Sequence, residues 1–366
     1  MKYCIYLILG IFILGLVSCQ QKSAEQTPQQ FVQSLPQEHP KEINRFQQAG
    51  DVYFSHLGYG SIPLDNGTAL LALRKPSMLL VVDEKGAVIR QVARQGKGPG
   101  EVIDPLYIVR GNEGHTLVYD QIKQKILHFD KQLDFIEEIT PQPKEQMSVS
   151  EVYPTTKEGK FIIRASSRRI WVDKEASPKL FLSSYTTEGR YGTTVTMKAR
   201  PIARQIMHGK VVGGRYVPYA ESQQIVVHPQ TQQLYTYWTG SGKIAELSSD
   251  LDTLRTIPVS LPSQRLSDTT YDSLESEIRS KQWETLKEKL PEMKVPVEKM
   301  KIDHKGRFWL KLNYRGNTQM WAVMDEEGTF KKIVHLPWGS MLTHISKHHL
   351  GVRLDDITFA LYEAVE

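Results

Sequence analysis

The sequence predicts an all-β fold, a six-bladed β-propeller, with seven blades as the open alternative. From about residue 50 onward, apolar bursts of four to seven residues alternate with turn residues, and the bursts are rich in β-branched and aromatic types. One turn, Asp-x-x-Gly, recurs between them, which is typical of a repeat array. Helical periodicity is nearly absent, whereas a parallel α/β fold needs a helix between its strands.

Seven apolar segments are the clearest predicted strands. They occupy residues 69–73, 78–82, 116–119, 125–129, 161–164, 233–238 and 308–312. The Asp-x-x-Gly turns lie at 83–86, 303–306 and 325–328, with a looser copy at 187–189. Because Asp can bond the backbone just downstream and glycine accepts a positive φ, each of these turns is expected to close a hairpin.

The spacing of these segments divides the chain into six blades. The expected blades cover residues 50–93, 102–141, 150–198, 211–260, 297–336 and 341–366. The last segment is too short for four strands, so a strand from near residue 50 is expected to complete it. That pairing closes the ring and removes the free sheet edges.

One segment, at about 267–291, departs from the strand pattern and predicts a single amphipathic helix. Thr269 and Asp272 offer a cap, and Pro291 ends the helix. A helix packed on the side or end of the propeller is the first interpretation, and a lid over the central channel is the alternative. The apolar side chains of its broad face are Tyr271, Leu274, Ile278, Trp283, Leu286 and Leu290.

The first 18 residues have the pattern of a secretory signal. Lys2 gives a charged start, residues 3–17 are almost wholly apolar, and small residues precede Cys19. The ending Leu-Val-Ser-Cys resembles the lipobox of bacterial lipoproteins, with an uncleaved apolar anchor as the alternative. The resemblance implies cleavage before Cys19, lipid on Cys19, and, because Gln20 follows it, an outer-membrane location facing the periplasm or the cell surface.

This interpretation also accounts for both cysteines, Cys4 and Cys19, so the mature domain has no disulfide and no Cys-based metal site. Residues 19–45 carry the expected lipid and then a flexible tether, since they are rich in Gln and Pro and poor in large apolar residues. The propeller domain is expected to cover 46–366.

A glycine-rich loop at 94–101, Arg-Gln-Gly-Lys-Gly-Pro-Gly-Glu, invites comparison with phosphate-binding loops. A Walker loop needs Ser or Thr after its lysine and a helix behind it. Neither is present here, and Pro99 removes one amide donor. The loop is therefore predicted to be a crossover between blades, where glycine permits the sharp turn.

Two parts of the chain carry a family resemblance. Residues 96–100, Pro105, 117–120 and 125–130 together resemble an NHL-type propeller repeat, although Gln124-Lys125 stands where that family usually has Asn-x-Arg. Residues 302–310 resemble the strand pair of another blade. With the lipobox, the chain resembles the TolB-like six-bladed propeller lipoproteins of Gram-negative gut bacteria, which implies a fold and a location but no reaction.

Positive charge concentrates in one part of the chain. Residues 157–210 hold 12 Lys and Arg against 4 Asp and Glu, or +8, whereas the whole chain is +5. Arginine beside aromatic rings suits a carboxylate, a sulfate or a sugar face; solvent-facing strand residues are the simpler alternative. The candidate ligand contacts are Arg168, Arg169, Trp171, Arg204 and Trp238, and nucleic acid is not expected as a partner of an exported protein.

Other candidate chemistry is weaker. His344 and His348 are four residues apart and could share a metal on a helix, but no Asp or Glu has a spacing that would complete such a site. Together with His335 and His349, they are therefore expected to be packed or exposed side chains. No catalytic residue, metal site or cofactor is predicted. Three Asp-[Ser/Thr] sites resemble the O-glycosylation acceptor of some Gram-negative gut bacteria, and their candidate acceptors are Thr253, Thr269 and Ser273.

These observations favour a lipid-anchored envelope protein that binds a protein, a glycan or another anionic ligand through loops on a propeller face. It would then act as a binding or scaffold protein and not as an enzyme. The alternative is a metal-dependent hydrolase or lyase with its site at the channel mouth.

Overall fold

The computed structural model describes residues 26–64, 66–111, 114–141, 147–157, 159–167, 173–174, 176–278 and 280–366. The signal segment 1–18 and the predicted lipidation site Cys19 lie outside these residues. Within the described residues, no helix is long and apolar enough to cross a membrane.

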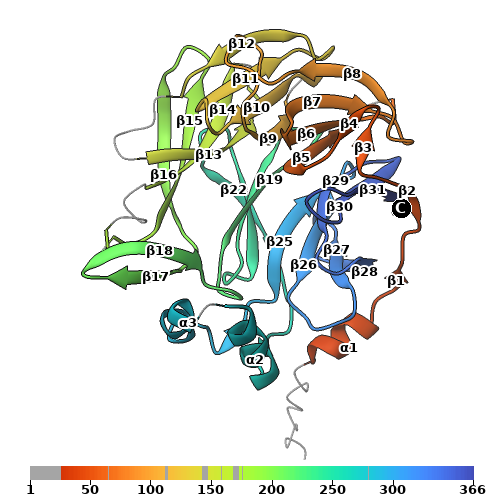
Figure 1. Ribbon diagram of the computed structural model, residues 1–366. Helices are drawn as coiled ribbons and strands as arrows, with labels where there is room; N and C mark the ends of the chain where they lie inside the picture. The colour runs from red at the N-terminus through yellow and green to blue at the C-terminus, as the bar shows by residue number, and fades with distance from the viewer. Residues whose placement is uncertain are drawn as a thin grey trace, which may run out of the picture.

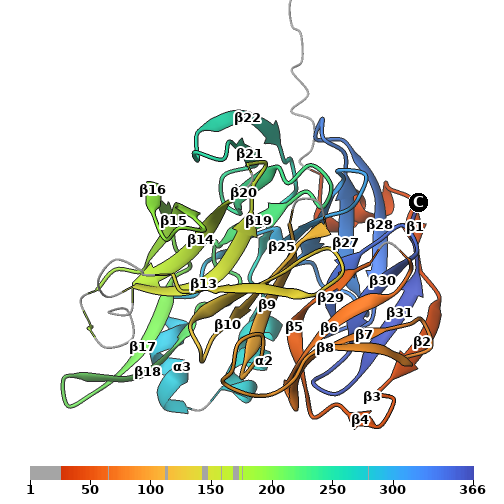
Figure 2. The ribbon, with the colours of Figure 1, turned by 90° about the horizontal axis from the view of Figure 1, so that it is seen from above.

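Six sheets, each built on four antiparallel strands, form the blades of a propeller (Figures 1 and 2). Blades 1 to 3 consist of β5 (His56–Pro63), β6 (Ala69–Lys75), β7 (Ser77–Val82) and β8 (Val88–Ala93); β9 (Pro105–Arg110), β10 (Thr116–Asp120), β11 (Lys125–Phe129) and β12 (Phe135–Ile139); and β13 (Met147–Pro154), β14 (Lys160–Ser167), β15 (Lys179–Thr186) and β16 (Tyr191–Lys198). Blades 4 to 6 consist of β19 (Gln223–Val227), β20 (Leu234–Trp238), β21 (Lys243–Leu247) and β22 (Thr253–Pro258); β25 (Val297–Ile302), β26 (Phe308–Leu312), β27 (Gln319–Met324) and β28 (Phe330–Leu336); and β29 (Met341–Ile345), β30 (His349–Arg353), β31 (Phe359–Glu363) and β2 (Glu42–Phe46). The prediction of a six-bladed propeller is confirmed.

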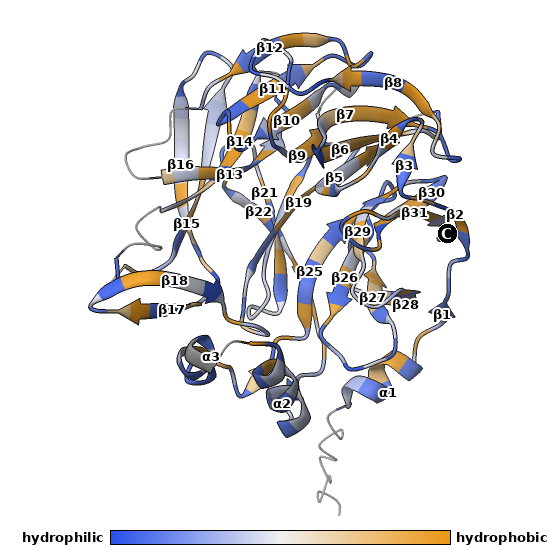
Figure 3. Cartoon of the chain, viewed as in Figure 1, coloured by the Kyte–Doolittle hydropathy of each residue, from blue (hydrophilic) through white to orange (hydrophobic). Residues whose placement is uncertain are grey.

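The first strand of each blade lies innermost, because β5 contacts the first strands of both neighbouring blades, β9 and β29. Each blade is a meander, so its two ends differ. We call the end that holds the connections from one blade to the next the crossover face, and the opposite end the hairpin face. Apolar residues fill the strands between the two faces, as Figure 3 shows for β6 and β7, both of which are almost wholly buried.

The Asp-x-x-Gly turns close hairpins on the hairpin face, as predicted. In the first of them, Asp83 Oδ1 accepts hydrogen bonds from the backbone N–H groups of Lys85 and Ala87, both at 2.8 Å. Gly86 has a φ of 81°, which a residue with a side chain rarely adopts. Asp303 and Asp325 make the same pair of backbone hydrogen bonds in blade 5.

The ring is closed by the N-terminal part of the described chain. Strand β2 pairs antiparallel with β31 and becomes the outer strand of the last blade. Strand β1 (Gln37–Glu38) adds to β28 in parallel, and helix α1 (Pro28–Gln33) packs its buried Phe31 against Phe330 with ring centroids 5.0 Å apart. The flexible tether predicted for 19–45 is therefore wrong from residue 28 onward, because pairing and packing hold this segment on the propeller.

Two insertions interrupt the regular blade order, and both lie in crossover connections. The hairpin of β17 (Ile202–Met207) and β18 (Lys210–Tyr216) joins blades 3 and 4, so the boundary predicted at residue 211 for blade 4 is wrong. The second insertion joins blades 4 and 5 and contains two helices. Figure 1 shows both insertions together at the lower side of the molecule. The remaining elements are the short pairs β3 (Gln48–Ala49) with β4 (Val52–Tyr53) and β23 (Gln264–Arg265) with β24 (Met293–Lys294).

The single helix predicted for 267–291 is instead two helices, α2 (Asp268–Glu277) and α3 (Ser280–Lys287). The break follows α2 at Ile278, whose backbone is extended (φ −112°, ψ 133°). Ile278 is buried with Trp283 and Leu286 against Ala203 and Val217 at the base of the β17–β18 hairpin, so burial of this side chain outweighs helical continuity. Ser267, and not Thr269, is the residue that precedes the first turn of α2. The contacts support packed helices over a lid.

Ring closure gives a first testable prediction. Phe46 on β2 is buried, and its ring lies 5.6 Å from that of Phe359 on β31. Phe46→Ala should lower the free energy of unfolding by about 3–5 kcal/mol, measured by urea denaturation, because a large cavity forms at the closing pair. The matched control is Ile43→Ala on the same strand, where the side chain is 46% exposed and the loss should be small. Equal losses for the two variants would contradict the role of β2 in closure.

Candidate functional site

The glycine-rich loop connects β8 to β9 as an inter-blade crossover, as predicted. One of its amide donors is occupied by the loop's own carboxylate, because Gly98 N–H donates to Glu101 Oε2 at 2.8 Å; the Arg94 guanidinium also donates to this carboxylate, from Nε to Oε1 at 2.9 Å. These two contacts hold the pKa of Glu101 below its usual range. A Cβ on Gly96 would lie 1.9 Å from Glu101 Oε2. Glu101 thus fills the place that a bound phosphate would need.

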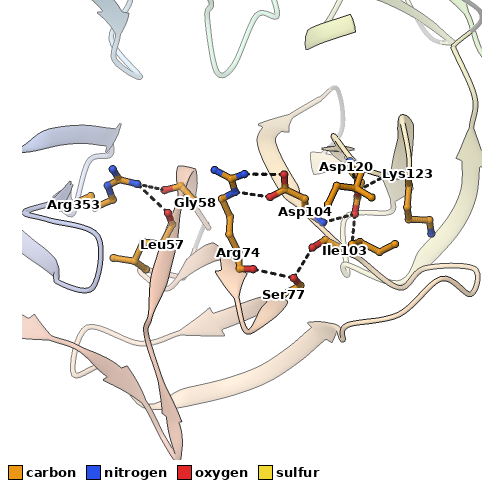
Figure 4. A network of polar contacts seen from close by, with 10 residues as sticks. Leu57, Gly58, Arg74, Ser77, Ile103, Asp104, Asp120, Lys123 and Arg353 are labelled. Carbon is orange, nitrogen blue, oxygen red and sulfur yellow. Dashed lines mark hydrogen bonds and ion pairs between the residues drawn. The ribbon is translucent and has the colours of Figure 1, made fainter. Parts of the chain in front are cut away.

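A buried carboxylate, Asp120, fixes the end of this crossover (Figure 4). Its Oδ2 accepts hydrogen bonds from the backbone N–H groups of Ile103 (2.6 Å) and Asp104 (3.0 Å), and its Oδ1 accepts one from Lys123 N–H (2.9 Å). The Lys123 ammonium donates to the carbonyl groups of Gly98 and Glu101, both at 3.0 Å. These charged groups hold the loop in place, so they are structural.

Neighbouring arginines on the same face are also used structurally. Arg74 makes a two-point ion pair with Asp104, at 2.5 Å and 2.8 Å, and Arg353 donates to the carbonyl group of Leu57 at 2.9 Å (Figure 4). A ligand would have to displace these bonds to use either guanidinium. Cations on this face that lack such partners are better placed to contact a ligand.

A pocket of about 370 Å³ opens at the crossover face between blades 3, 4 and 5. Three of the strands that line it, β13, β19 and β25, are the inner strands of their blades, so the pocket lies at the mouth of the central channel. Four basic and two acidic side chains line it: Arg164, Lys179, Arg200, Lys299, Glu151 and Glu298. We call it the channel-mouth pocket.

Both acids of the channel-mouth pocket already have cationic partners. Glu151 pairs with Arg164, and Glu298 pairs with Lys311, whose Nζ lies 2.8 Å from Oε2. Within the part of the chain that the structure describes, Arg200 donates through Nε to the carbonyl group of Val217, at 3.0 Å, and burial lowers its pKa. The pocket thus keeps positive charge that its own carboxylates do not pair.

Lys299 is the clearest example of this unpaired positive charge in the channel-mouth pocket. Across the described ranges, its ammonium has no hydrogen-bond acceptor and no ion-pair partner. Burial lowers the pKa of Lys299; Glu298 opposes this shift, while Lys311, Arg353 and Arg200 add to it. A desolvated ammonium among other cations gains most from an incoming anion.

A second lysine continues the line into the channel. Lys301 follows Lys299 by two residues on β25, so both side chains point to the same side of the strand. Its Nζ donates to the carbonyl group of Thr343 on blade 6 at 2.8 Å, and burial lowers its pKa to about 8. The channel side of β25 is therefore basic at the mouth and below it.

The two predicted contact residues that the structure describes do not lie in the channel-mouth pocket. Arg168, Arg169 and Trp171 lie outside the described residues. Arg204 donates to the carbonyl groups of Lys174 and Ala176, and Trp238 Nε1 donates to Glu221 Oε2 at 2.9 Å; the lining of the channel-mouth pocket includes neither residue. From the predicted basic segment, the structure instead places Arg164 and Arg200 in the pocket.

The late histidines are packed or exposed, and no helix joins them. His344 lies buried in β29, with Nδ1 2.7 Å from Ser61 Oγ, and His348 is exposed in the turn that follows. His349 is buried in β30. In the part of the chain that the structure describes, no three His, Cys, Asp or Glu residues are grouped as metal ligands would be.

The three candidate glycosylation acceptors are all exposed. Thr253 begins β22, and Thr269 and Ser273 lie on α2. An exposed hydroxyl is what a glycan needs, although Thr269 Oγ1 already lies 3.2 Å from a guanidinium nitrogen of Arg315. Modification at these positions stays a prediction.

The low pKa of Lys301 makes stability depend on pH. Because the folded-state pKa of about 8 lies below the ordinary 10.5, the unfolded chain binds more protons between those values. The free energy of unfolding should therefore rise with pH in that window, by up to about 1.4 kcal/mol per pH unit from this group. Lys301→Met should remove that rise in urea denaturation at pH 8, 9 and 10, whereas the exposed Lys347→Met should keep it. The same slope in Lys301→Met as in the parent would contradict the assignment.

Comparison with known proteins agrees with this architecture. Residues 66–188 match the model of a family described as a 6-bladed β-propeller, DUF5128. No curated protein matches the chain in sequence.

Solved structures resemble the chain at low identity. A protein of Bacteroides fragilis described as exported shares 13% identity over 90% of this chain and 99% of its own, with a TM-score of 0.50. A DUF4221 family member from Bacteroides vulgatus shares 9% identity over 88% and 97%, with a TM-score of 0.51. A gluconolactonase from Xanthomonas campestris shares 11% identity over 87% and 88%, with a TM-score of 0.46. At these identities the likeness concerns the fold alone, and the chain is a six-bladed β-propeller.

Proposed function

We propose that this propeller is a cell-envelope binding protein that holds an anionic group of its ligand in the channel-mouth pocket. The observation that carries the proposal is the unpaired Lys299 ammonium beside the partly desolvated Arg200. A carboxylate, sulfate or phosphate group is the matching chemistry, because such groups accept charge-assisted hydrogen bonds from both cation types.

The cations of the pocket differ between the free and the bound protein in what surrounds them. In the free protein, Lys299 and Arg200 have lost part of their hydration, and no carboxylate among the described residues forms an ion pair with either of them. An anion entering the pocket supplies the missing partner, so the desolvation cost already met in folding does not have to be met again on binding. The free pocket is therefore already arranged to bind a negatively charged group.

The size of the pocket narrows the ligand. A volume of about 370 Å³ holds one small anion or a terminal group of a larger molecule, such as an acidic sugar or an acidic side chain of a protein. Gln223 and Gln224 of β19 also line it, and their amides can both donate and accept. A group that combines a carboxylate with hydroxyls fits this mixture.

The proposed location rests on the sequence and on one distant likeness. The lipobox pattern ending at Cys19 supports a lipid anchor, and a structurally similar protein of Bacteroides fragilis is described as exported. In the sequence, Arg168, Arg169 and Trp171 lie within four residues of the end of β14, the strand that carries Arg164. We include them in the proposal as further contacts to the same ligand.

Anion binding is testable by isothermal titration calorimetry with inorganic sulfate, citrate and glucuronate. At least one of these probes should bind, and its affinity should fall as salt is raised. Lys299→Met should weaken the binding by about tenfold or more, because one charge-assisted contact is lost without a large change in volume. Arg168→Glu with Arg169→Glu should weaken it as well.

The exposed Lys347→Met serves as the matched control and should leave the affinity unchanged. If none of the three anions binds, or if the Lys299→Met and Lys347→Met variants bind equally well, the channel-mouth pocket is not the anion site.

Metal analysis of the purified protein distinguishes the binding proposal from its alternative, a metal-dependent hydrolase or lyase. The proposal expects no stoichiometric divalent ion after dialysis, since the acids at the channel mouth are paired with Arg164 and Lys311. A tightly held ion at one per chain, lost in a Glu151→Gln or Glu298→Gln variant, would replace the binding proposal with the hydrolytic one.

A further inference from the structure

A second and larger pocket opens on the hairpin face, at the opposite end of the blades from the channel-mouth pocket. Its volume is about 560 Å³, and it lies where turns of blades 2, 3 and 4 meet. Its floor is apolar and formed by Leu117, Ile139 and Phe161. We call it the hairpin-face pocket.

Polar groups of a different kind from those of the channel mouth surround this floor. Hydroxyl groups come from Thr156, Thr187 and Thr231. The two lysines, Lys157 and Lys160, share the carboxylate of Asp250 at 2.9 Å and 2.5 Å. The lining is thus rich in hydrogen-bonding groups, and its positive charge is already paired.

Two histidines complete the lining, and strand register brings them together. His128 on β11 stands directly opposite Leu117 on β10, and His115 lies two residues before Leu117. Glu137 on β12 stands directly opposite His128 on its other side. Direct and diagonal cross-strand neighbours share one face of a sheet, so the three side chains meet on the face of blade 2 that turns toward blade 3.

The three groups form one hydrogen-bonded chain. His128 Nδ1 lies 3.3 Å from Glu137 Oε1, and His128 Nε2 lies 2.8 Å from His115 Nδ1. A carboxylate only accepts, so a neutral His128 donates from Nδ1 and accepts at Nε2. A neutral His115 then donates from Nδ1, which leaves its Nε2 as an acceptor.

That acceptor is free to meet a ligand. Over the described residues, His115 Nε2 has no hydrogen-bond partner, and the His115 side chain is partly exposed in the pocket lining. The carboxylate at the far end of the chain therefore determines, through His128, which hydrogen-bonding role His115 offers to the pocket.

We propose that the hairpin-face pocket binds an uncharged, hydroxylated small molecule, with a ligand hydroxyl donating to His115 Nε2. The apolar floor suits the C–H face of a sugar ring or polyol, and the threonine hydroxyls suit its remaining oxygens. A charged ligand is disfavoured because Asp250 pairs both lysines. This second site is separate from the proposed anion site and does not depend on it.

The first experiment measures the tautomer of His115 directly, by ¹⁵N nuclear magnetic resonance of the histidine side chains in the full chain at neutral pH. The expected result is a proton on Nδ1 and none on Nε2 of His115. His128→Leu should abolish this preference, whereas His128→Gln, which keeps an acceptor, should retain part of it. A proton on Nε2 of His115 in the parent protein would overturn the proposal without any variant having to fold.

The second experiment adds glucose, galactose and glycerol as neutral probes and glucuronate as a charged one. A neutral probe should shift the His115 Nε2 resonance, and His115→Phe should weaken that probe's binding by about tenfold, consistent with the loss of one hydrogen bond in a small site. The exposed His348→Phe is the control and should bind normally. Binding by glucuronate alone, no response to any neutral probe, or equal binding by the His115→Phe and His348→Phe variants would each overturn the assignment.

Discussion

The architecture depends on the pairing of β2 with β31. A propeller whose last blade lacked its fourth strand would expose the edge of β31, and edges of this kind invite pairing with other chains. The pairing joins residues about 320 positions apart in the chain, as the bond from Tyr362 to Glu42 shows. Closure also fixes how far apart the inner strands stand. The charges at the channel mouth come from blades 3 and 5 and from the connection that follows blade 3, so their spacing is a property of the closed ring and not of any single blade.

The closed ring gathers cations that are far apart in sequence. Arg164, Arg200 and Lys299 come from different blades or connections and meet in one pocket, and Lys301 continues the line below them. Each would be better hydrated in the unfolded chain, so the core must offset the cost of bringing them together. On the same face, Asp120 and Asp104 show the opposite case, in which the backbone and Arg74 satisfy a buried carboxylate completely. The contrast between satisfied and unsatisfied charge separates the structural part of the crossover face from the candidate site.

Much of the fold could be predicted from local patterns. Turns such as 83–86 and strands such as 78–82 depend on residues close in sequence, so composition and spacing were enough to find them. The break at Ile278 could not be predicted, because it follows from burial against Ala203 and Val217, about 70 residues earlier. Residues 28–45 looked like a tether because they are polar, yet the backbone pairs with β28 and β31, which composition does not report.

The candidate sites were harder to predict than the fold. Arg164 and Arg200 belonged to the basic segment that the sequence marked, but Lys299 and Lys301 showed only an ordinary polar alternation, and their exposure to the channel depends on the ring. His115 and His128 could have been paired by counting residues across the hairpin that turns at 121–124, since that register puts Leu117 opposite His128. To place Glu137 beside His128, the register of the next strand, β12, would also have been needed.

The position of helix α1 limits how far the crossover face can lie from a lipid anchor at Cys19. It packs on Leu312 and Tyr314, beside the β26–β27 turn, and so begins at the crossover face. Six residues, 20–25, separate Cys19 from the first described residue, and six extended residues span at most about 20 Å. If Cys19 carries the lipid as proposed, only a short segment joins the membrane anchor to the propeller. That segment begins at the crossover face, where the channel-mouth pocket opens. The anion that this pocket holds would then have to be one that comes to within a few nanometres of the membrane surface, and the hairpin-face pocket would be the one turned toward the open compartment.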